Sequence, residues 1–464
     1  MPKRNIIWIL AIIAAAVVVI WTTQHRSMPT PPAAAPVELR TVYHVRQLIK
    51  DRYAGDIDDR AVQQGAVRGM IESLDAASSY VSPDRMVGFR DHMRGLIRGF
   101  GLKLEHVDDG ILVVAPLFGS PAHYAGILPG DRIVAVDGQP TAEMSFDSVY
   151  AKLNDPTRQS AELSVVRAYR PLKPIRLQRR EFPIETVTGL SRDADDQWIY
   201  LIDEGSGIAY VRISEFVSET AQELQQAFRR LPETRAVVLD LRDNPGGLLP
   251  AAVAVTDLLL SEGPVVTVFS PNEGPKAYLA RREGTTYPTM PVVVLINGQT
   301  ASAAEIVAGA LAANGRAVLI GELTLGKTSI QSMYPLPDGM GQVNITTARY
   351  VVGAVDPTEP PPGDAVGGAP GVQPHVVVPV APELHRRLSR LRFVSALGPR
   401  ILAAHLNGAA VSAPGAAPEP DLAEQISMDP QLSRAVRLLA EPGAVERILR
   451  QAAADSDPAV RGDE

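Results

Sequence analysis

The sequence predicts an α/β core with a mainly parallel sheet, a β-domain inserted before this core, and helical regions at both ends. Three observations predict this fold class. Short apolar runs alternate with helical stretches between residues 190 and 380, turn-forming glycines are spread over residues 96–181, and apolar residues recur at helical spacing near both ends. Parallel strands that are buried on both faces have this apolar character, and helices between them cover the sheet.

Composition limits the classes of function. The 464 residues suffice for two to four domains, and a hydrophobic content of 45% is ordinary for a globular protein. A net charge of −7 gives no support for nucleic-acid binding. The chain has no cysteine, which excludes disulfides, thiolate metal sites and a cysteine nucleophile. Its eight histidines form no HExxH pair, so we expect no metal and no other cofactor.

The N-terminus predicts a membrane anchor within residues 1–27. Lys3 and Arg4 precede an apolar run over residues 6–21, which is short for a membrane span of about 20 residues. No small-residue cleavage site follows closely, so we favour an uncleaved signal anchor over a cleaved signal peptide. We therefore expect an inner-membrane protein whose chain beyond the anchor lies in the periplasm. A proline-rich spacer follows at residues 28–37.

The remaining chain divides into four predicted regions. A helical region covers 38–95, the β-domain 96–181, the α/β core 182–382, and a helical region with a tail 383–464. The core strands are expected at Ile208–Ile213, Ala236–Leu241, Val265–Phe269 and Val292–Ile296, and the helices between them at Thr220–Arg230, Leu249–Leu260 and Ser302–Ala313. The last ten residues are expected to be disordered.

Ser302 is the strongest candidate for a catalytic residue. It stands at an expected helix start, where unpaired backbone N–H groups and the helix dipole favour negative charge, so the Ala303 N–H is well placed for an oxyanion. Lys327 follows on the next strand and no histidine is near, which predicts a serine activated by an amine. Without Lys327, a plain helix cap would be the better interpretation of Ser302.

Five stretches resemble the carboxyl-terminal processing (tail-specific) protease family. They are YVRISEF from Tyr210, VVLDLRDNPGG from Val237, ASAAEIVAGAL from Ala301, GELTLGKTSIQ from Gly321 and TTARY from Thr346. The resemblance implies a crotonase-like α/β core and a serine endopeptidase that acts near the C-terminal ends of proteins. It also implies that Gly246 or Gly247 completes the oxyanion hole and that Gln331 orients Lys327.

Residues 96–181 resemble a PDZ domain. The matching elements are Gly99-Phe-Gly-Leu102, Ser120-Pro-Ala, Ala125-Gly126, Gly130-Asp131, Ile133 and Asp137-Gly138. In such a domain the backbone of Gly99, Phe100, Gly101 and Leu102 would hold the carboxylate of a peptide that adds a strand to the sheet edge. The partners implied are proteins or peptides with free C-termini, and a homo-oligomer or an activating adaptor protein stays open.

A general base near neutral pH must be uncharged, so the pKa of Lys327 must fall well below the ordinary value of about 10.4. Burial supplies such a fall, whereas a carboxylate partner opposes it. If residues 327–331 are extended, the side chains of Lys327 and Gln331 share a face but lie about 13 Å apart. A local turn would bring them closer, and the sequence leaves this open.

Two other functions compete with proteolysis. Gly321–Thr328 satisfies the phosphate-loop pattern, but a phosphate loop opens a helix, and Pro335 and Pro337 follow too soon for one. The second alternative is an inactive PDZ adaptor on a protease scaffold, against which the joint presence of Ser302, Lys327 and Gln331 argues. Arg242, Asp243 and Glu305 are charged neighbours of the site that surface ion pairs explain equally well.

Overall fold

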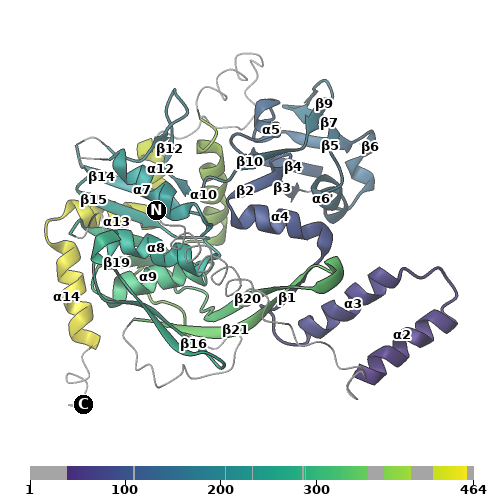
Figure 1. Cartoon of the computed structure of the whole chain (residues 1–464). Helices are drawn as coiled ribbons and strands as arrows, with labels where there is room; N and C mark the ends of the chain where they lie inside the picture. Colours follow the sequence, from purple (N-terminus) through teal and green to yellow (C-terminus); the bar gives the residue numbers. More distant parts are fainter. Residues whose placement is uncertain are drawn as a thin grey trace, which may run out of the picture. The chain divides into compact units, whose positions relative to one another are not determined.

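The computed structural model describes residues 39–107, 110–203, 205–231, 234–284, 287, 289–353, 370–398 and 422–456 (Figure 1). The expected anchor at 6–21, the spacer at 28–37 and most of the expected disordered tail lie outside these residues. Within the described ranges, no helix has the length and apolar character needed to cross a membrane.

The first described region is helical, as its apolar spacing predicts. Helix α2 spans Arg40–Arg52 and helix α3 spans Asp59–Glu72. Asp59 at the start of α3 forms ion pairs with Arg46 and Lys50 of α2 at 3.2 and 2.6 Å. Residues up to Met70 form a unit separate from the rest of the chain.

The inserted β-domain has its own apolar core. Its sheet runs in the order β3 (Leu102–Val107), β4 (Gly110–Pro116), β5 (Arg132–Val136), β7 (Ser160–Arg167) and β8 (Arg170–Pro171), with β6 (Gln139–Pro140) and β9 (Ile175–Gln178) at its sides. The core is completed by α5 (Pro121–Tyr124) and α6 (Phe146–Asn154). Strand β2 (Leu96–Gly99) pairs with β10 (Arg180–Pro183) where the insertion is expected to begin and end.

The catalytic core is built on a six-stranded sheet. Its order is β11 (Val187–Thr188), β14 (Ile208–Ile213), β15 (Ala236–Asp240), β18 (Val292–Ile296), β19 (Ala317–Gly321) and β22 (Val376–Val377). The pairs from β14 to β22 are parallel, and only the pair β11–β14 in this sheet is antiparallel. The carboxyl ends of β14, β15, β18 and β19 therefore lie at one edge.

Successive residues of the central strands contribute to two different apolar clusters. Val237, Leu239 and Val294 pack with helices α7 (Thr220–Arg229), α8 (Leu249–Leu259) and α9 (Ala303–Ala313) on one face. Val238 and Leu295 pack on the other face against α13 (Pro430–Ala440) and α14 (Ala444–Ser456). Because side chains alternate along a strand, a strand that is apolar at every position needs cover on both faces. Figure 1 shows the sheet between these two helical layers.

One expected core strand belongs elsewhere. Strand β16 (Pro264–Ser270) lies in a second, antiparallel sheet with β17 (Gly274–Leu279), β21 (Gln342–Val352), β20 (Ser329–Pro335) and β1 (Ser79–Val81). The prediction that the apolar run Val265–Phe269 is a strand of the parallel sheet was therefore wrong. Its first three residues are buried, whereas Val268 and Phe269 are half-buried. Val265 and Val266 pack with Ile306 and Ala310 of α9.

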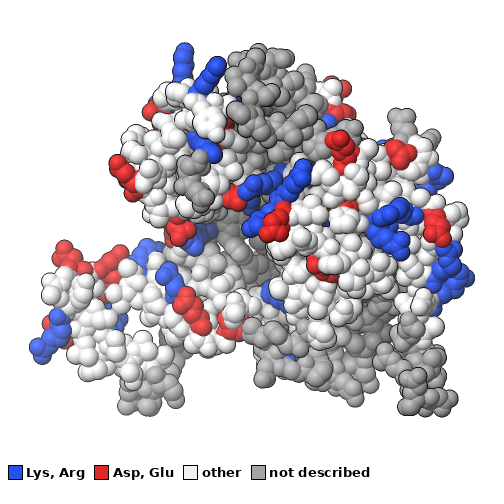
Figure 2. All heavy atoms as spheres, turned by 180° about the vertical axis from the view of Figure 1, so that it is seen from behind, with Lys and Arg blue, Asp and Glu red and all other residues white. Residues whose placement is uncertain are grey.

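The C-terminal region is helical and packs against the core. Helix α10 (Pro382–Ser395) precedes α12 (Leu422–Met428), and Pro430 then starts α13 behind the N-cap Asp429. Helix α14 was not predicted. Basic and acidic side chains are interspersed over the face in Figure 2.

Candidate active site

Ser302 lies at the point where the chain leaves β18 and enters α9. It is the N-cap of α9, and its φ of 54° with ψ of −119° is a conformation that a residue with a Cβ rarely adopts. Such a conformation costs on the order of 1–3 kcal/mol and persists only where surrounding contacts fix it. A sharp strand-to-helix turn of this kind is also how other hydrolases expose a serine nucleophile.

The oxyanion segment Asn244–Leu248 lies directly against Ser302. A Cβ added at Gly246 would stand 2.7 Å from the Ser302 Cβ and 2.9 Å from the Ala303 nitrogen, so only glycine permits this approach. The Gly246 N–H donates to Asn244 Oδ1 at 2.8 Å and is therefore already used. The N–H groups of Gly247 and Ala303 have no acceptor among the described residues. Of the two glycines suggested by sequence, Gly247 is the better donor.

Contacts in the backbone hold this segment in place. Gly247 forms a bridge with Phe216, whose N–H donates to the Gly246 carbonyl and whose carbonyl accepts from the Leu248 N–H, both at 2.8 Å. The Ala301 N–H donates to the Asn244 carbonyl at 2.9 Å, which ties the oxyanion segment to the nucleophile turn. The donors are thus fixed before a substrate arrives.

Glu305 connects the nucleophile to the expected base. Its Oε2 accepts from the backbone N–H of Ser302 at 2.8 Å and from that of Lys327 at 2.9 Å. Its Oε1 accepts from the Gly326 N–H at 2.7 Å and the Thr324 hydroxyl at 2.5 Å. One carboxylate therefore brings the backbones of both candidate residues together.

Tyr350 makes a second connection between the same two residues. Its hydroxyl lies 3.0 Å from the carbonyl oxygen of Ser302 and 2.6 Å from that of Lys327. Burial, aided by the charge of Glu305, raises the pKa of Tyr350 well above its ordinary value, so the hydroxyl stays protonated and can donate. Sequence reasoning assigned no role to Tyr350, although it lies in one of the family stretches.

Lys327 contacts Gln331 across a short distance. The amine donates to Gln331 Oε1 at 2.9 Å, and the Gln331 amide donates to Ser329 and Thr346 hydroxyls at 3.0 and 3.1 Å. Lys327 precedes β20, and the register of β20 against β21 shifts between Ile330 and Gln331. This irregularity brings together two side chains that a regular strand would keep about 13 Å apart.

Burial lowers the pKa of Lys327, while the charges of Glu305 and Asp75 oppose this change. The direction is the one that a general base requires. No hydrogen bond joins the Ser302 hydroxyl and the Lys327 amine among the described residues.

Two of the three charged neighbours, Arg242 and Glu305, are more deeply buried than surface ion pairs would be. Glu305 and Arg242 are each 3% exposed, and Asp243 lies in a turn with a φ of 61°. Arg242 forms hydrogen bonds with Asp240 and Asp429. The sequence contained a signal for the contact between Glu305 and the Ser302 backbone, because a glutamate three residues after a serine N-cap is the pattern of a capping box.

The residues of the expected peptide-binding loop, 99–102, differ in how far they are buried. Phe100 is 3% exposed and belongs to the core of the β-domain, so its side chain is not on an open surface. Gly101 packs on Ser120, since a Cβ there would lie 2.0 Å from the Ser120 Cβ. Leu102 is half-buried at the start of β3. Within the described residues β3 pairs only with β4 and is an edge strand.

The phosphate-loop alternative does not fit the local structure. Gly321 ends β19, and the residues up to Thr328 form no helix before β20 begins at Ser329. A phosphate loop needs the N-terminus of a following helix to bind the anion. Lys327 faces Gln331 instead.

Comparison with known proteins gives the class and then the family. The model of peptidase family S41 matches residues 207–378, and the PDZ domain model matches residues 112–167. The fold and site are those of a serine-type peptidase with a PDZ domain. A carboxy-terminal-processing protease from Bartonella bacilliformis is 30% identical over 84% of this chain and 86% of its own length. A carboxyl-terminal-processing protease from Synechocystis is 32% identical over 65% and 70%.

The chain belongs to the carboxyl-terminal processing protease family, which confirms the resemblance seen in the sequence. Among solved structures, a photosystem II D1 C-terminal processing protease is 29% identical, with a TM-score of 0.42 over 73% of this chain and 86% of that one.

Proposed function

We propose that this peptidase uses Ser302 as nucleophile and Lys327 as general base. The observation that carries the proposal is the strained Ser302, held beside two N–H donors and linked through Glu305 to a half-buried amine of lowered pKa. The inactive-adaptor alternative gives no reason to maintain this strain.

In the proposed reaction the Lys327 amine takes the Ser302 proton as the hydroxyl oxygen attacks the peptide carbonyl. The Gly247 and Ala303 N–H groups stabilise the oxyanion, and the amine returns the proton to the leaving amine. Water then hydrolyses the acyl-enzyme with the same base. Because Lys327 contacts Gln331 rather than Ser302, substrate binding must move the amine toward the hydroxyl.

We further propose that the PDZ domain selects substrates by a free C-terminal carboxylate, which would add a strand to β3. Its edge position supports this role. The crotonase-like arrangement of the core is supported by the parallel pairs from β14 to β22. The signal anchor at residues 6–21 and a periplasmic active site are proposals from the sequence, tested by membrane fractionation and protease accessibility in spheroplasts.

The direct test is cleavage of an unfolded reporter that ends in an apolar residue, with a free or an amidated C-terminus. We expect the parent to cleave the free form faster, and Ser302→Ala to lose nearly all activity while unfolding at the same urea concentration. Undiminished cleavage by Ser302→Ala would exclude the nucleophile. Equal rates on both reporters would exclude carboxylate recognition.

A further inference from the structure

Helix α10 lies between the PDZ domain and the oxyanion segment, and it touches both. On one side, Arg390 pairs with Glu105 of β3 at 2.6 Å, and the Lys103 amine of β3 lies 5.4 Å from the centre of the Phe393 ring. On the other side, three side chains of α10 surround the carboxylate of Asp243. Among the described helices, α10 alone makes side-chain ion pairs with both β3 and Asp243.

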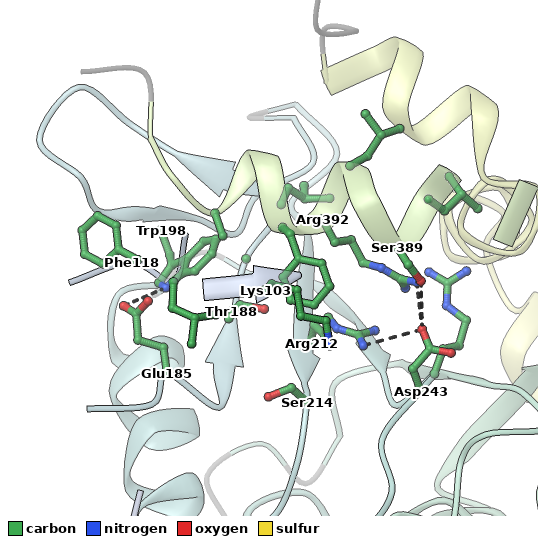
Figure 3. A pocket seen from close by; sticks show the side chains of 18 of the residues that line it. Lys103, Phe118, Glu185, Thr188, Trp198, Arg212, Ser214, Asp243, Ser389 and Arg392 are labelled. Atoms are coloured by element: carbon green, nitrogen blue, oxygen red, sulfur yellow. Dashed lines mark hydrogen bonds and ion pairs between the residues drawn. The ribbon is translucent and has the colours of Figure 1, made fainter. Parts of the chain in front are cut away.

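The contacts with Asp243 follow one face of α10. His385 Nε2 lies 3.1 Å from Asp243 Oδ1, and the Ser389 hydroxyl and Arg392 Nη2 lie 3.5 and 2.9 Å from Oδ2. Positions 385, 389 and 392 recur at helical spacing, so one helix face meets one carboxylate. Figure 3 shows Ser389 and Arg392 directed at Asp243.

Asp243 is the residue at which the two loops of the active site meet. It immediately precedes the oxyanion segment, and its N–H donates to Asn297 Oδ1 at 3.0 Å while Asn297 Nδ2 donates back to its carboxylate at 2.7 Å. Asn297 starts the turn that leads to Ser302. The positive φ of Asp243 must be held by such contacts, since a residue with a Cβ does not favour it.

The other side of α10 meets the strand to which a substrate tail would add. Leu102 and Leu104 of β3 face the core of the PDZ domain, whereas Lys103 and Glu105 alternate with them and face α10. A peptide added to the free edge of β3 would therefore act on the strand whose outer face α10 touches.

The space beside these contacts is not close-packed. Lys103, Phe118, Trp198, Arg212 and Arg392 help to line a cavity of about 620 Å³ between the PDZ domain, α10 and the core (Figure 3). The ion pair that joins α10 to β3 is partly exposed, since the side chains of Arg390 and Glu105 are 49% and 38% exposed. Such a contact can rearrange at small cost in free energy.

We propose that α10 is a coupling helix, which transmits occupation of the β3 edge to Asp243 and thereby positions the Gly247 and Ala303 donors. The inference rests on the proposed tail recognition. Binding of a tail at β3 would reach Asp243 through the contacts that α10 makes with both. His385, Ser389 and Arg392 are positioning residues, because they act on the reacting atoms only through Asp243.

The test uses Arg390→Glu in the full-length protein, with a synthetic tail peptide added in trans. The reporter has an amidated end, so it does not compete for the PDZ domain. We expect the tail peptide to accelerate its cleavage by the parent, and Arg390→Glu to reduce that acceleration by up to about fivefold, the upper end for losing a partly exposed ion pair. Basal cleavage and the Kd of the peptide, measured by fluorescence anisotropy, should stay within about twofold.

Two matched variants make the result specific. Arg386→Glu changes the same charge one turn earlier on the same helix, where Arg386 pairs with Glu383 of α10 itself, and should behave as the parent. The exchanged pair Arg390→Glu with Glu105→Arg should restore acceleration. Full acceleration in Arg390→Glu, or none in a parent that cleaves the reporter, would overturn the coupling.

Hydrogen exchange separates this inference from the proposed function. In Ser302→Ala protein, where no cleavage is needed, the tail peptide should slow exchange of the amides in residues 244–248, and Arg390→Glu should abolish that change. An unaltered exchange pattern with the peptide bound overturns the coupling. Failure of the protease assignment appears instead as cleavage that survives Ser302→Ala.

Discussion

The two halves of the proposed active site are built in different ways. Ser302, Ala303 and the oxyanion segment stand on the carboxyl ends of buried parallel strands, and close backbone contacts such as that of Gly246 with Ser302 fix them. Lys327 and Gln331 stand on a loop and on a strand of the antiparallel sheet, where polar side chains hold them. The comparison teaches that backbone packing holds the half around Ser302 in one geometry before substrate binds. The half around Lys327 and Gln331 is held by side-chain hydrogen bonds, which can break and re-form with other partners.

The largest effect is expected from filling the contact that fixes the nucleophile half. Gly246→Ala should lower kcat by about 10²–10³-fold, because the added methyl group displaces Ser302 and the oxyanion donors. Gly298→Ala, in the turn that leads to Ser302, is the matched control, since its Cβ would meet only the Leu323 carbonyl at 3.8 Å. Single-turnover cleavage rates would measure the effect of both variants. A fully active Gly246→Ala variant would show that the half around Ser302 is not rigid.

The base half should respond to pH. We expect kcat/KM to rise with pH as Lys327 loses its proton, with a midpoint below the ordinary lysine pKa of 10.5, because burial disfavours the charged amine. The negative charge of Asp75 raises this pKa, so Asp75→Asn should move the midpoint to lower pH. A pH–rate profile that is flat from acid to alkaline pH would contradict an amine base.

A smaller effect on kcat should follow from removing the Tyr350 hydroxyl, which links the Ser302 half of the site to the Lys327 half. Tyr350→Phe deletes the hydroxyl between the carbonyls of Ser302 and Lys327, so we expect a loss of about 1 kcal/mol in the free energy of unfolding and roughly a tenfold fall in kcat. Tyr334→Phe, at an exposed position of β20, serves as control. The kcat per folded molecule distinguishes positioning from simple destabilisation, because destabilisation leaves the folded fraction fully active with an unchanged KM.

The smallest effect concerns the support behind the nucleophile half. His92, at the end of α4 (Pro83–Met93), lies 2.6 Å from Glu215, which precedes the Phe216 that holds Gly246. The hydrogen bond to Glu215 raises the pKa of His92. The stabilisation is therefore complete below the unfolded pKa of about 6.5 and is lost as pH rises through the higher folded value.

Urea unfolding between pH 5.5 and 9 measures this contribution, which for a partly exposed pair should be under about 1 kcal/mol. His92→Gln should remove the pH dependence that this pair adds to the free energy of unfolding. The remaining pH dependence of that free energy should stay unchanged. If parent and variant show the same pH dependence, the pair does not contribute to stability.

The sequence by itself determined the main elements of the core and the family. The bounds of β14 and β18 matched the apolar runs, and α7, α8 and α9 ended within a residue or so of the expected positions, because burial on two faces leaves a strong local pattern. Ser302, Lys327 and the glycines could be predicted as site residues because their chemistry and their motifs are local, and the structure brings them into one region.

Tertiary structure alone decided how these residues meet. The placement of β16 in a second sheet, the irregularity that brings Gln331 to Lys327, and the burial of Arg242 and Glu305 depend on partners far away in the chain. The roles of Tyr350 and of Asp243 also arise only when separate loops pack together. Local pattern fixes which face of an element is apolar, whereas the choice of partner depends on long-range packing that no short stretch of sequence encodes.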